Sequence, residues 1–188
     1  MEKTIRTNKL ISLIQNSLSV ICSLLSTGTL LQTLLVTLGF STKLIYIHST
    51  VIQAVNVAAL LLFAKTAGEH NLIKRYALTG LPSGVLLLCY LPFCSQSDAS
   101  WKAFGLLLLI GIFQAVVNAL RTGYSCALPY LLYPAGDYGP ITAVSGIVSG
   151  AISFLMGYAL SALTQSVPYV ILMAGAFGIS ASLEFVGI

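Results

Sequence analysis

Long apolar segments separated by short polar breaks run through the whole sequence. Each segment reaches about 18 residues or more, the length that crosses the hydrocarbon core of a bilayer as a helix. Apolar runs such as 85–88 and 106–109 break the two-residue alternation of a transmembrane β-strand, so helices are expected. The pattern predicts an all-α membrane protein with six transmembrane helices, at about residues 10–38, 44–64, 76–93, 103–133, 141–163 and 169–186.

The composition supports this class. Hydrophobic residues make up 57% of the 188 residues and charged residues 7%, whereas a soluble globular domain carries about 25% charged residues. A water-soluble fold is therefore excluded, and we expect residues 1–188 to form one six-helix transmembrane domain. The basic start and the first apolar segment could pass for a signal peptide. That segment is far longer than a signal h-region and lacks a small-x-small cleavage site, so we expect it to be retained as the first span.

The distribution of lysine and arginine predicts the orientation, because cytoplasmic loops are enriched in these residues. Residues 1–9 and 65–75 carry three each, six in total, against Lys43 and Lys102 on the opposite side. Both termini are therefore expected in the cytoplasm. The net charge of +4 follows from this topology and requires no nucleic-acid partner. The expected surroundings are a lipid bilayer, that of the cell (plasma) membrane.

Polar residues of the first segment recur every three or four positions, which confines them to one face of a helix. Serine and threonine on this face allow helices to pack closely and hydrogen-bond across the contact. Gln15 and Asn16 are larger than packing requires, and an amide buried without partners is costly. Helix packing and a wall of a water-filled cavity are both compatible with the stripe, and we favour the cavity.

The fourth segment repeats this pattern with a charge, because Gln114, Asn118, Arg121 and Ser125 stack along one helix face. A lipid-facing arginine at a helix centre costs about 3 kcal/mol or more, so we expect Arg121 deep in the span and facing the interior. No acidic residue lies within the neighbouring spans, which leaves a substrate carboxylate or phosphate, or an acid on a partner chain, to pair with it. In the alternative, the helix ends near Asn118 and Arg121 reaches the inner interface. We predict Asn16, Gln114, Asn118 and Arg121 as the substrate-binding residues.

Other positions indicate packing rather than chemistry. The fifth segment carries a stripe of glycine and serine that includes Gly146 and Gly150, typical of a close-packing face. His48, near the outer end of the second segment, is expected to be an interfacial histidine rather than a proton relay, because no carboxylate accompanies it. The four cysteines form no C-x-x-C pair, and the sequence contains no Walker loop, H-E-x-x-H or G-x-S-x-G motif. We therefore expect no metal, no cofactor and no enzymatic activity.

The six inward-ended segments, the polar-striped first helix and the fourth helix with glutamine and arginine together resemble the N-terminal half of a major facilitator superfamily transporter. The resemblance covers the whole chain, and its most specific stretches are 26–40 and 111–134, the latter followed by a glycine-rich fifth helix. It implies that helices one, two, four and five line a central cavity and that helices three and six are peripheral. Such transporters hold their substrate near the midplane between two six-helix halves.

The function expected from these features is secondary transport of a small polar or anionic solute by one half of such a transporter. The partner would be a second six-helix half or another copy of this chain. Two other functions stay open. A six-helix substrate-binding membrane subunit of an energy-coupling transporter has a similar size and needs no second half. A structural scaffold would use every polar stripe for packing alone.

Overall fold

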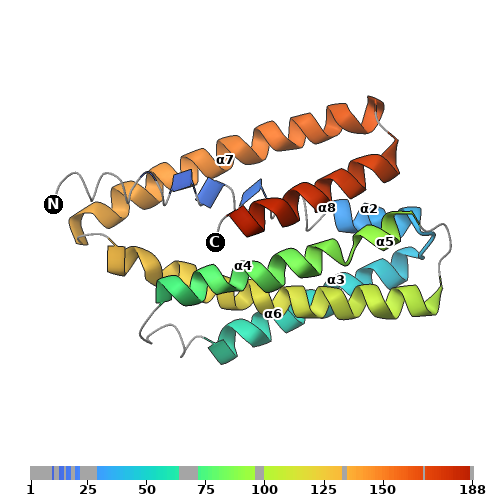
Figure 1. Ribbon diagram of the computed structural model, residues 1–188, viewed down its shortest axis with the longest axis horizontal. Coiled ribbons are helices and arrows are strands. Elements are labelled where there is room, and N and C mark those ends of the chain that lie inside the picture. The colour runs from blue at the N-terminus through green and yellow to red at the C-terminus, as the bar shows by residue number, and fades with distance from the viewer. Residues whose placement is uncertain are drawn as a thin grey trace.

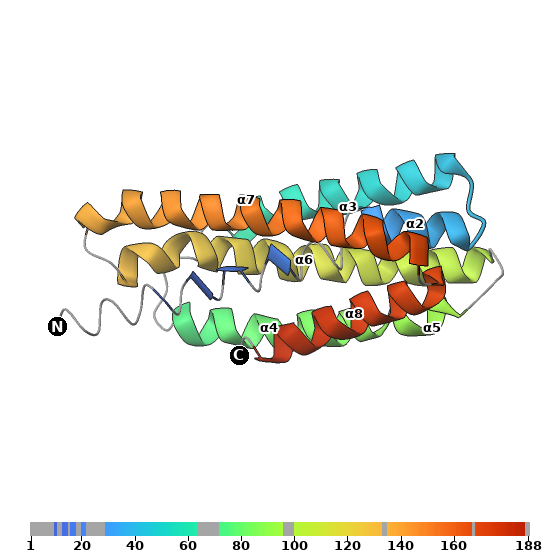
Figure 2. The same ribbon diagram turned by 90° about the horizontal axis from the view of Figure 1, so that it is seen from above.

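The computed structural model describes residues 10, 13–14, 16–17, 20–21, 29–63, 72–95, 100–132, 135–166 and 168–186. Every regular element in these ranges is an α-helix. The helices are α2 (Thr29–Thr37), α3 (Thr42–Phe63), α4 (Leu72–Leu88), α5 (Leu91–Cys94), α6 (Trp101–Leu132), α7 (Ala135–Ser166) and α8 (Tyr169–Val186). The longer helices run roughly lengthwise along the molecule (Figure 1, Figure 2).

Four helical stretches are long and apolar enough to cross a bilayer: Thr42–Phe63, Lys74–Cys94, Trp101–Ala127 and Gly136–Ala159. A shorter apolar stretch covers Ile171–Ser182. These lengths and compositions indicate an integral membrane protein, which confirms the predicted class. Most of the predicted first span, 10–38, lies outside the described residues, apart from α2 and a few helical residues before it.

The turn between α2 and α3 forms where the sequence predicts the first break. Gly39 has a φ of 83°, a left-handed conformation that glycine adopts without a steric penalty. The N–H of Gly39 donates to the carbonyl of Val36 (2.9 Å), and the N–H of Phe40 donates to that of Leu35 (3.1 Å). This pair of bonds is the Schellman motif, which satisfies carbonyls at a helix end and lets the chain reverse into α3.

The predicted third span, 76–93, is not one continuous helix, because α4 ends at Leu88 and α5 begins after a short turn. Pro92 has no N–H to donate to the Leu88 carbonyl, and proline disfavours helical backbone at the residue before it. In the turn, the N–H of Tyr90 donates to the carbonyl of Leu87 (3.2 Å), three residues back instead of four. The chain between α4 and α5 is therefore wound more tightly than a regular helix.

The break predicted between the fourth and fifth spans, at 134–140, is wrong for most of its length, because α7 begins at Ala135. Pro140 lies inside this helix. Pro140 has no N–H, so the carbonyl of Gly136 lacks its helical hydrogen bond. Because this position is close to the helix start, few of the helical hydrogen bonds are lost. Asp137 in the first turn interacts favourably with the positive end of the helix dipole. The predicted fifth span therefore starts six residues too late.

Helix α6 lies between α3 and α4, and α4 also packs on α8 (Figure 2). The most deeply buried apolar side chains, each at most 2% exposed, include Leu35, Leu87, Leu107, Met173 and Phe177. The ring of Tyr90 stacks on that of Phe177, with centroids 5.0 Å apart and an interplanar angle of 19°. This contact fixes the turn between α4 and α5 against α8.

Helices α3 and α6 approach each other closely at Gly111. A Cβ at this position would lie 2.5 Å from Ile52 Cδ1 and 3.5 Å from His48 Nε2. Small residues at helix contacts are a common means of close packing in membranes, where burial between helices brings little hydrophobic gain. The absent side chain of Gly111 therefore provides the space that His48 and Ile52 occupy.

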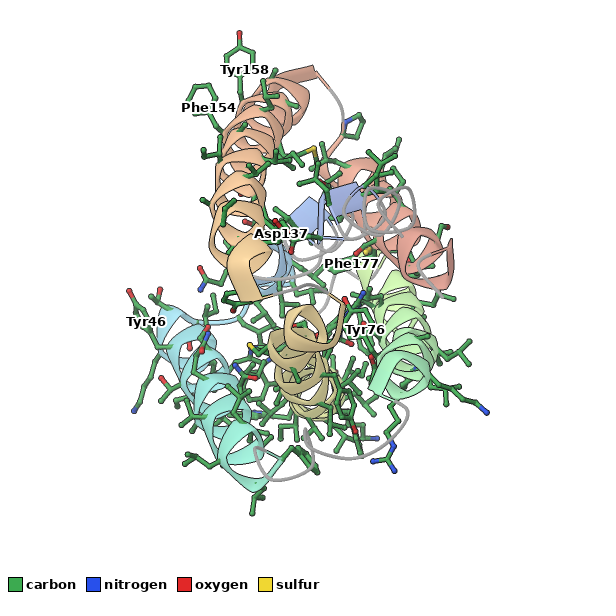
Figure 3. All side chains as sticks on the ribbon, turned by 90° about the vertical axis from the view of Figure 1, so that its left-hand side faces the viewer. Tyr46, Tyr76, Asp137, Phe154, Tyr158 and Phe177 are labelled. Carbon is green, nitrogen blue, oxygen red and sulfur yellow. The ribbon has the colours of Figure 1, made fainter. Side chains whose placement is uncertain are left out.

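Helix α7 stands apart from the group formed by α3, α4 and α6, as Figure 3 shows from one end of the molecule. No residue of its most apolar stretch, within Gly136–Ala159, is buried. Phe154 (76% exposed) and Tyr158 (74% exposed) project away from the other helices. Among the described residues, α7 contacts Asn16, α6 and α8.

Candidate functional site

A buried polar pair joins α4 to α6. The Gln114 amide nitrogen, Nε2, donates a hydrogen bond of 3.0 Å to Ser83 Oγ. Gln114 is 6% exposed and Ser83 is fully buried. The Gln114 amide oxygen, Oε1, is buried and has no hydrogen-bond partner among the described residues. Gln114 is therefore fixed between two helices, with one acceptor left unsatisfied in an apolar environment.

Arg121, two turns after Gln114 on α6, also contacts α4. Its Nε donates to the Tyr76 hydroxyl at 3.4 Å, and its guanidinium carbon lies 5.2 Å from the centroid of the Tyr76 ring. This is the distance range of a cation–π contact. Arg121 is half-buried, whereas Tyr76 is buried in a small cluster with Tyr124.

Arg121 lies in the later part of α6. Twenty residues separate it from Trp101, where α6 begins, which is about 30 Å of helix and about the thickness of the hydrocarbon core. Its contact residue Tyr76 is also the first residue of the predicted third span. Both observations place Arg121 in the later part of α6, beside the beginning of α4. The alternative helix end near Asn118 is wrong, because α6 continues to Leu132.

The other two predicted residues lie in different surroundings. Asn118, one turn after Gln114, is half-buried on α6. Asn16 is exposed, and its Nδ2 donates to Ser145 Oγ (2.5 Å) and Ser149 Oγ (3.0 Å) of α7. The described contacts thus divide the four predicted site residues into two groups. Gln114 and Arg121 bind α4, while Asn16 binds α7.

The predicted packing stripe of α7 is also divided between two faces. Ser145 and Ser149 are half-buried and meet Asn16. Gly146 and Gly150 are exposed, and a Cβ added at either would meet no atom within 4 Å. The glycines of this stripe therefore contact no described helix, and the hydrogen bonds of α7 come from its serines.

His48 is a polar residue whose position the sequence reasoning missed. The ring is 1% exposed between α3 and α6, so the expectation of an interfacial histidine is wrong. Its edge approaches Phe104, with ring centroids 6.2 Å apart. The Nε2 atom has no hydrogen-bond partner among the described residues. The signal was present in the spacing, because His48 shares a helix face with the buried residues Ile45 and Ala59.

Metal-binding chemistry has no site in the described part of the chain, where no group of three His, Cys, Asp or Glu side chains could hold an ion. Cys89, Cys94 and Cys126 are free thiols. The arrangement offers hydrogen-bonding amides and hydroxyls at helix contacts, together with one half-buried guanidinium.

Comparison of the chain with protein-family models, with curated proteins and with solved structures gave no match.

The hydrogen bond between Gln114 and Ser83 predicts a measurable coupling. Ser83→Ala and Gln114→Leu should each destabilise the protein, and the double variant should be less destabilised than the sum of the two. Hydrogen bonds between membrane helices contribute about 0.6 kcal/mol on average and about 1.7 kcal/mol at most, so the coupling energy should lie in this range. The measurement is a double-mutant cycle of unfolding in mixed detergent micelles. Pairing Gln114→Leu with Ser125→Ala is the control, because Ser125 is exposed and bonds within its own helix; this pair should be additive.

Proposed function

We propose that this chain is one half of a two-part secondary transporter of the major facilitator type, which moves a small polar or anionic solute across the membrane. In this proposal it crosses the membrane six times with both termini in the cytoplasm. The observation that carries the proposal is the position of α7. This helix is long and apolar enough to span the membrane, and no residue of its most apolar stretch is buried. Two of its serines, Ser145 and Ser149, accept hydrogen bonds from Asn16.

The direction of the helices supports the proposed topology. The first residues of α4 and α7 and the last residues of α6 and α8 lie at the same end of the molecule (Figure 1). Lys74 and Arg75 belong to this end, which is the end expected in the cytoplasm. Consecutive spans therefore alternate in direction, as six crossings with an inward start and an inward end require.

In this proposal the solute passes along the part of the molecule that carries Asn16 and Asn118. Asn16 is exposed and Asn118 is half-buried, so neither amide is enclosed as Gln114 is. Polar side chains within spans usually face a protein interior or a water-filled cavity rather than lipid. Arg121 near the inner end would attract an anion entering from the cytoplasm. A second six-helix half, or another copy of this chain, would supply the opposite wall.

The proposal is tested by the accessibility of single cysteines to a membrane-impermeant thiol reagent. In a variant without its four native cysteines, Asn16→Cys and Asn118→Cys should react in the native membrane. Lys43→Cys and Lys102→Cys are the water-exposed references. Leu106→Cys and Phe154→Cys are the matched lipid-facing controls, because both side chains are exposed on apolar helix surfaces, and they should not react.

Reaction at positions 16 and 118 that is protected by a transported solute would support the proposal and identify the solute class. Gln114→Cys should react more slowly than Asn118→Cys, because position 114 is buried against α4. If positions 16 and 118 are as inert as positions 106 and 154 while 43 and 102 react, then the polar stripes serve packing and the proposal is wrong.

A further inference from the structure

The His48 side chain is a titratable group buried between α3 and α6, with 1% of its surface exposed. One ring nitrogen donates to the backbone carbonyl of Leu107. Because Nε2 is the nitrogen without a partner, Nδ1 is the donor. Nε2 is therefore the ring nitrogen without a partner among the described residues, and it is enclosed by protein.

The surroundings of this nitrogen are apolar. Nε2 faces the space above Gly111, beside the side chain of Ile52, and the ring edge lies against Phe104. On α6, no titratable side chain occurs between Lys102 and Arg121, and α2 contains none. On α3, Lys43 and Tyr46 are both exposed, as is Lys102 on α6. No carboxylate of the described residues on these helices is available to balance a positive charge on His48.

We propose that Nε2 of His48 is a proton-binding site, and that its protonation loosens the contact between α3 and α6. The proton adds to the Nε2 lone pair, which converts the imidazole to an imidazolium and adds one positive charge without electron transfer. A buried cation without a partner is costly, so the protonated ring has to move toward water or the helices have to separate. The contact at Gly111 has no spare room, because Ile52 already fills the space above it, so the charged ring reaches water only if α3 and α6 separate. The inference depends on the packing of α3 on α6 and not on the nature of any solute.

Stability should therefore fall as the pH falls. The unfolded chain binds the proton readily, whereas the packed state binds it only at the expense of this contact, so acidification favours the loosened or unfolded state. The chain contains its own reporter, because Trp101 is the only tryptophan, and its ring lies 6.2 Å from Phe104, which in turn contacts His48.

The test is a pH titration of the purified full chain in lipid nanodiscs from pH 8 to pH 4.5. The ring nitrogens of isotope-labelled histidine are followed by NMR, and the emission of Trp101 and the melting temperature are followed in parallel. His48→Phe and His48→Gln remove the proton site. His70→Gln is the matched control, because His70 is the second of the two histidines in the sequence; it also assigns the NMR signals.

We expect His48 to be a single neutral tautomer with the proton on Nδ1 at pH 8, and to become protonated together with a change in Trp101 emission and a fall in melting temperature. Both changes should persist in His70→Gln and be lost in His48→Phe. If His48→Phe does not fold, His48→Gln gives the same comparison. The proposal is overturned if His48 stays neutral throughout the titration of the folded protein, or if the Trp101 change persists without His48.

Discussion

Replacing Gly111 with leucine is expected to disrupt the packing of α3 on α6. The position offers no room, because even a Cβ would lie 2.5 Å from Ile52 Cδ1. Leucine adds three further carbon atoms at a contact that already encloses His48. Overpacking of this kind costs about 1 to 3 kcal/mol or more, because side chains leave their rotamers and backbones shift. The measurement is the free energy of unfolding in mixed micelles, together with the fraction of protein that elutes as a single species.

The chain offers a control and a rescue for this variant. Gly105 lies on the same helix, and a Cβ there would meet no atom within 4 Å, so Gly105→Leu should leave stability almost unchanged. Adding Ile52→Ala to Gly111→Leu removes the side chain that the leucine displaces, and part of the loss should be recovered. Equal destabilisation by leucine at positions 105 and 111 would contradict the close approach of α3 and α6.

Replacing Phe177 with alanine is expected to have an effect of comparable or larger size. The side chain is fully buried and stacks on Tyr90, which is itself 1% exposed. Truncation of a buried phenylalanine to alanine in soluble proteins costs about 3 to 5 kcal/mol, part of which is transfer from water. In a bilayer that part is smaller, because lipid is as apolar as the protein core, and the lost packing and aromatic contact remain. We therefore expect a loss of about 2 to 4 kcal/mol in the same unfolding measurement.

Phe154→Ala is the matched control for this variant. Phe154 is 76% exposed and projects outward from α7 (Figure 3). Its removal should change the free energy of unfolding by less than about 0.5 kcal/mol, as for most surface positions. A large loss for Phe154→Ala would instead show that another helix covers this face of α7 in the membrane. An equally small loss for both phenylalanines would contradict the described packing of α4 and α5 on α8.

The sequence predicted some parts of the fold closely. The bounds of α8 coincide with the predicted span 169–186, and α3 and α6 begin within two residues of the prediction. The break before Thr42 was predicted because Gly39 and its polar neighbours are turn residues, and the structure shows Gly39 with a positive φ. The break predicted at 134–140 is mostly helix in the structure. A proline near a helix start removes so little hydrogen bonding that the helix can include it.

The sequence also predicted that Gln114 and Arg121 share a face of α6, and both do meet α4. It did not predict which helix that face would contact. Helical spacing determines which side chains lie on one face, but the neighbour of that face depends on contacts between residues far apart in the chain. His48 shows the same limit, since its burial depends on Gly111, which lies 63 positions later in the sequence (111 − 48 = 63).

By itself, the sequence determined the helical, membrane-embedded class of the protein and the approximate length and position of most of its helices. These properties are local, because a bilayer requires each crossing segment to be apolar, long enough and internally hydrogen-bonded. Only the tertiary structure decided that Asn16 binds α7, that Gln114 and Arg121 bind α4, and that His48 is enclosed against α6. Lipid surrounds every apolar face equally well, so the choice of neighbour rests on the fit of a few small and polar side chains, and this fit exists only once the helices are packed.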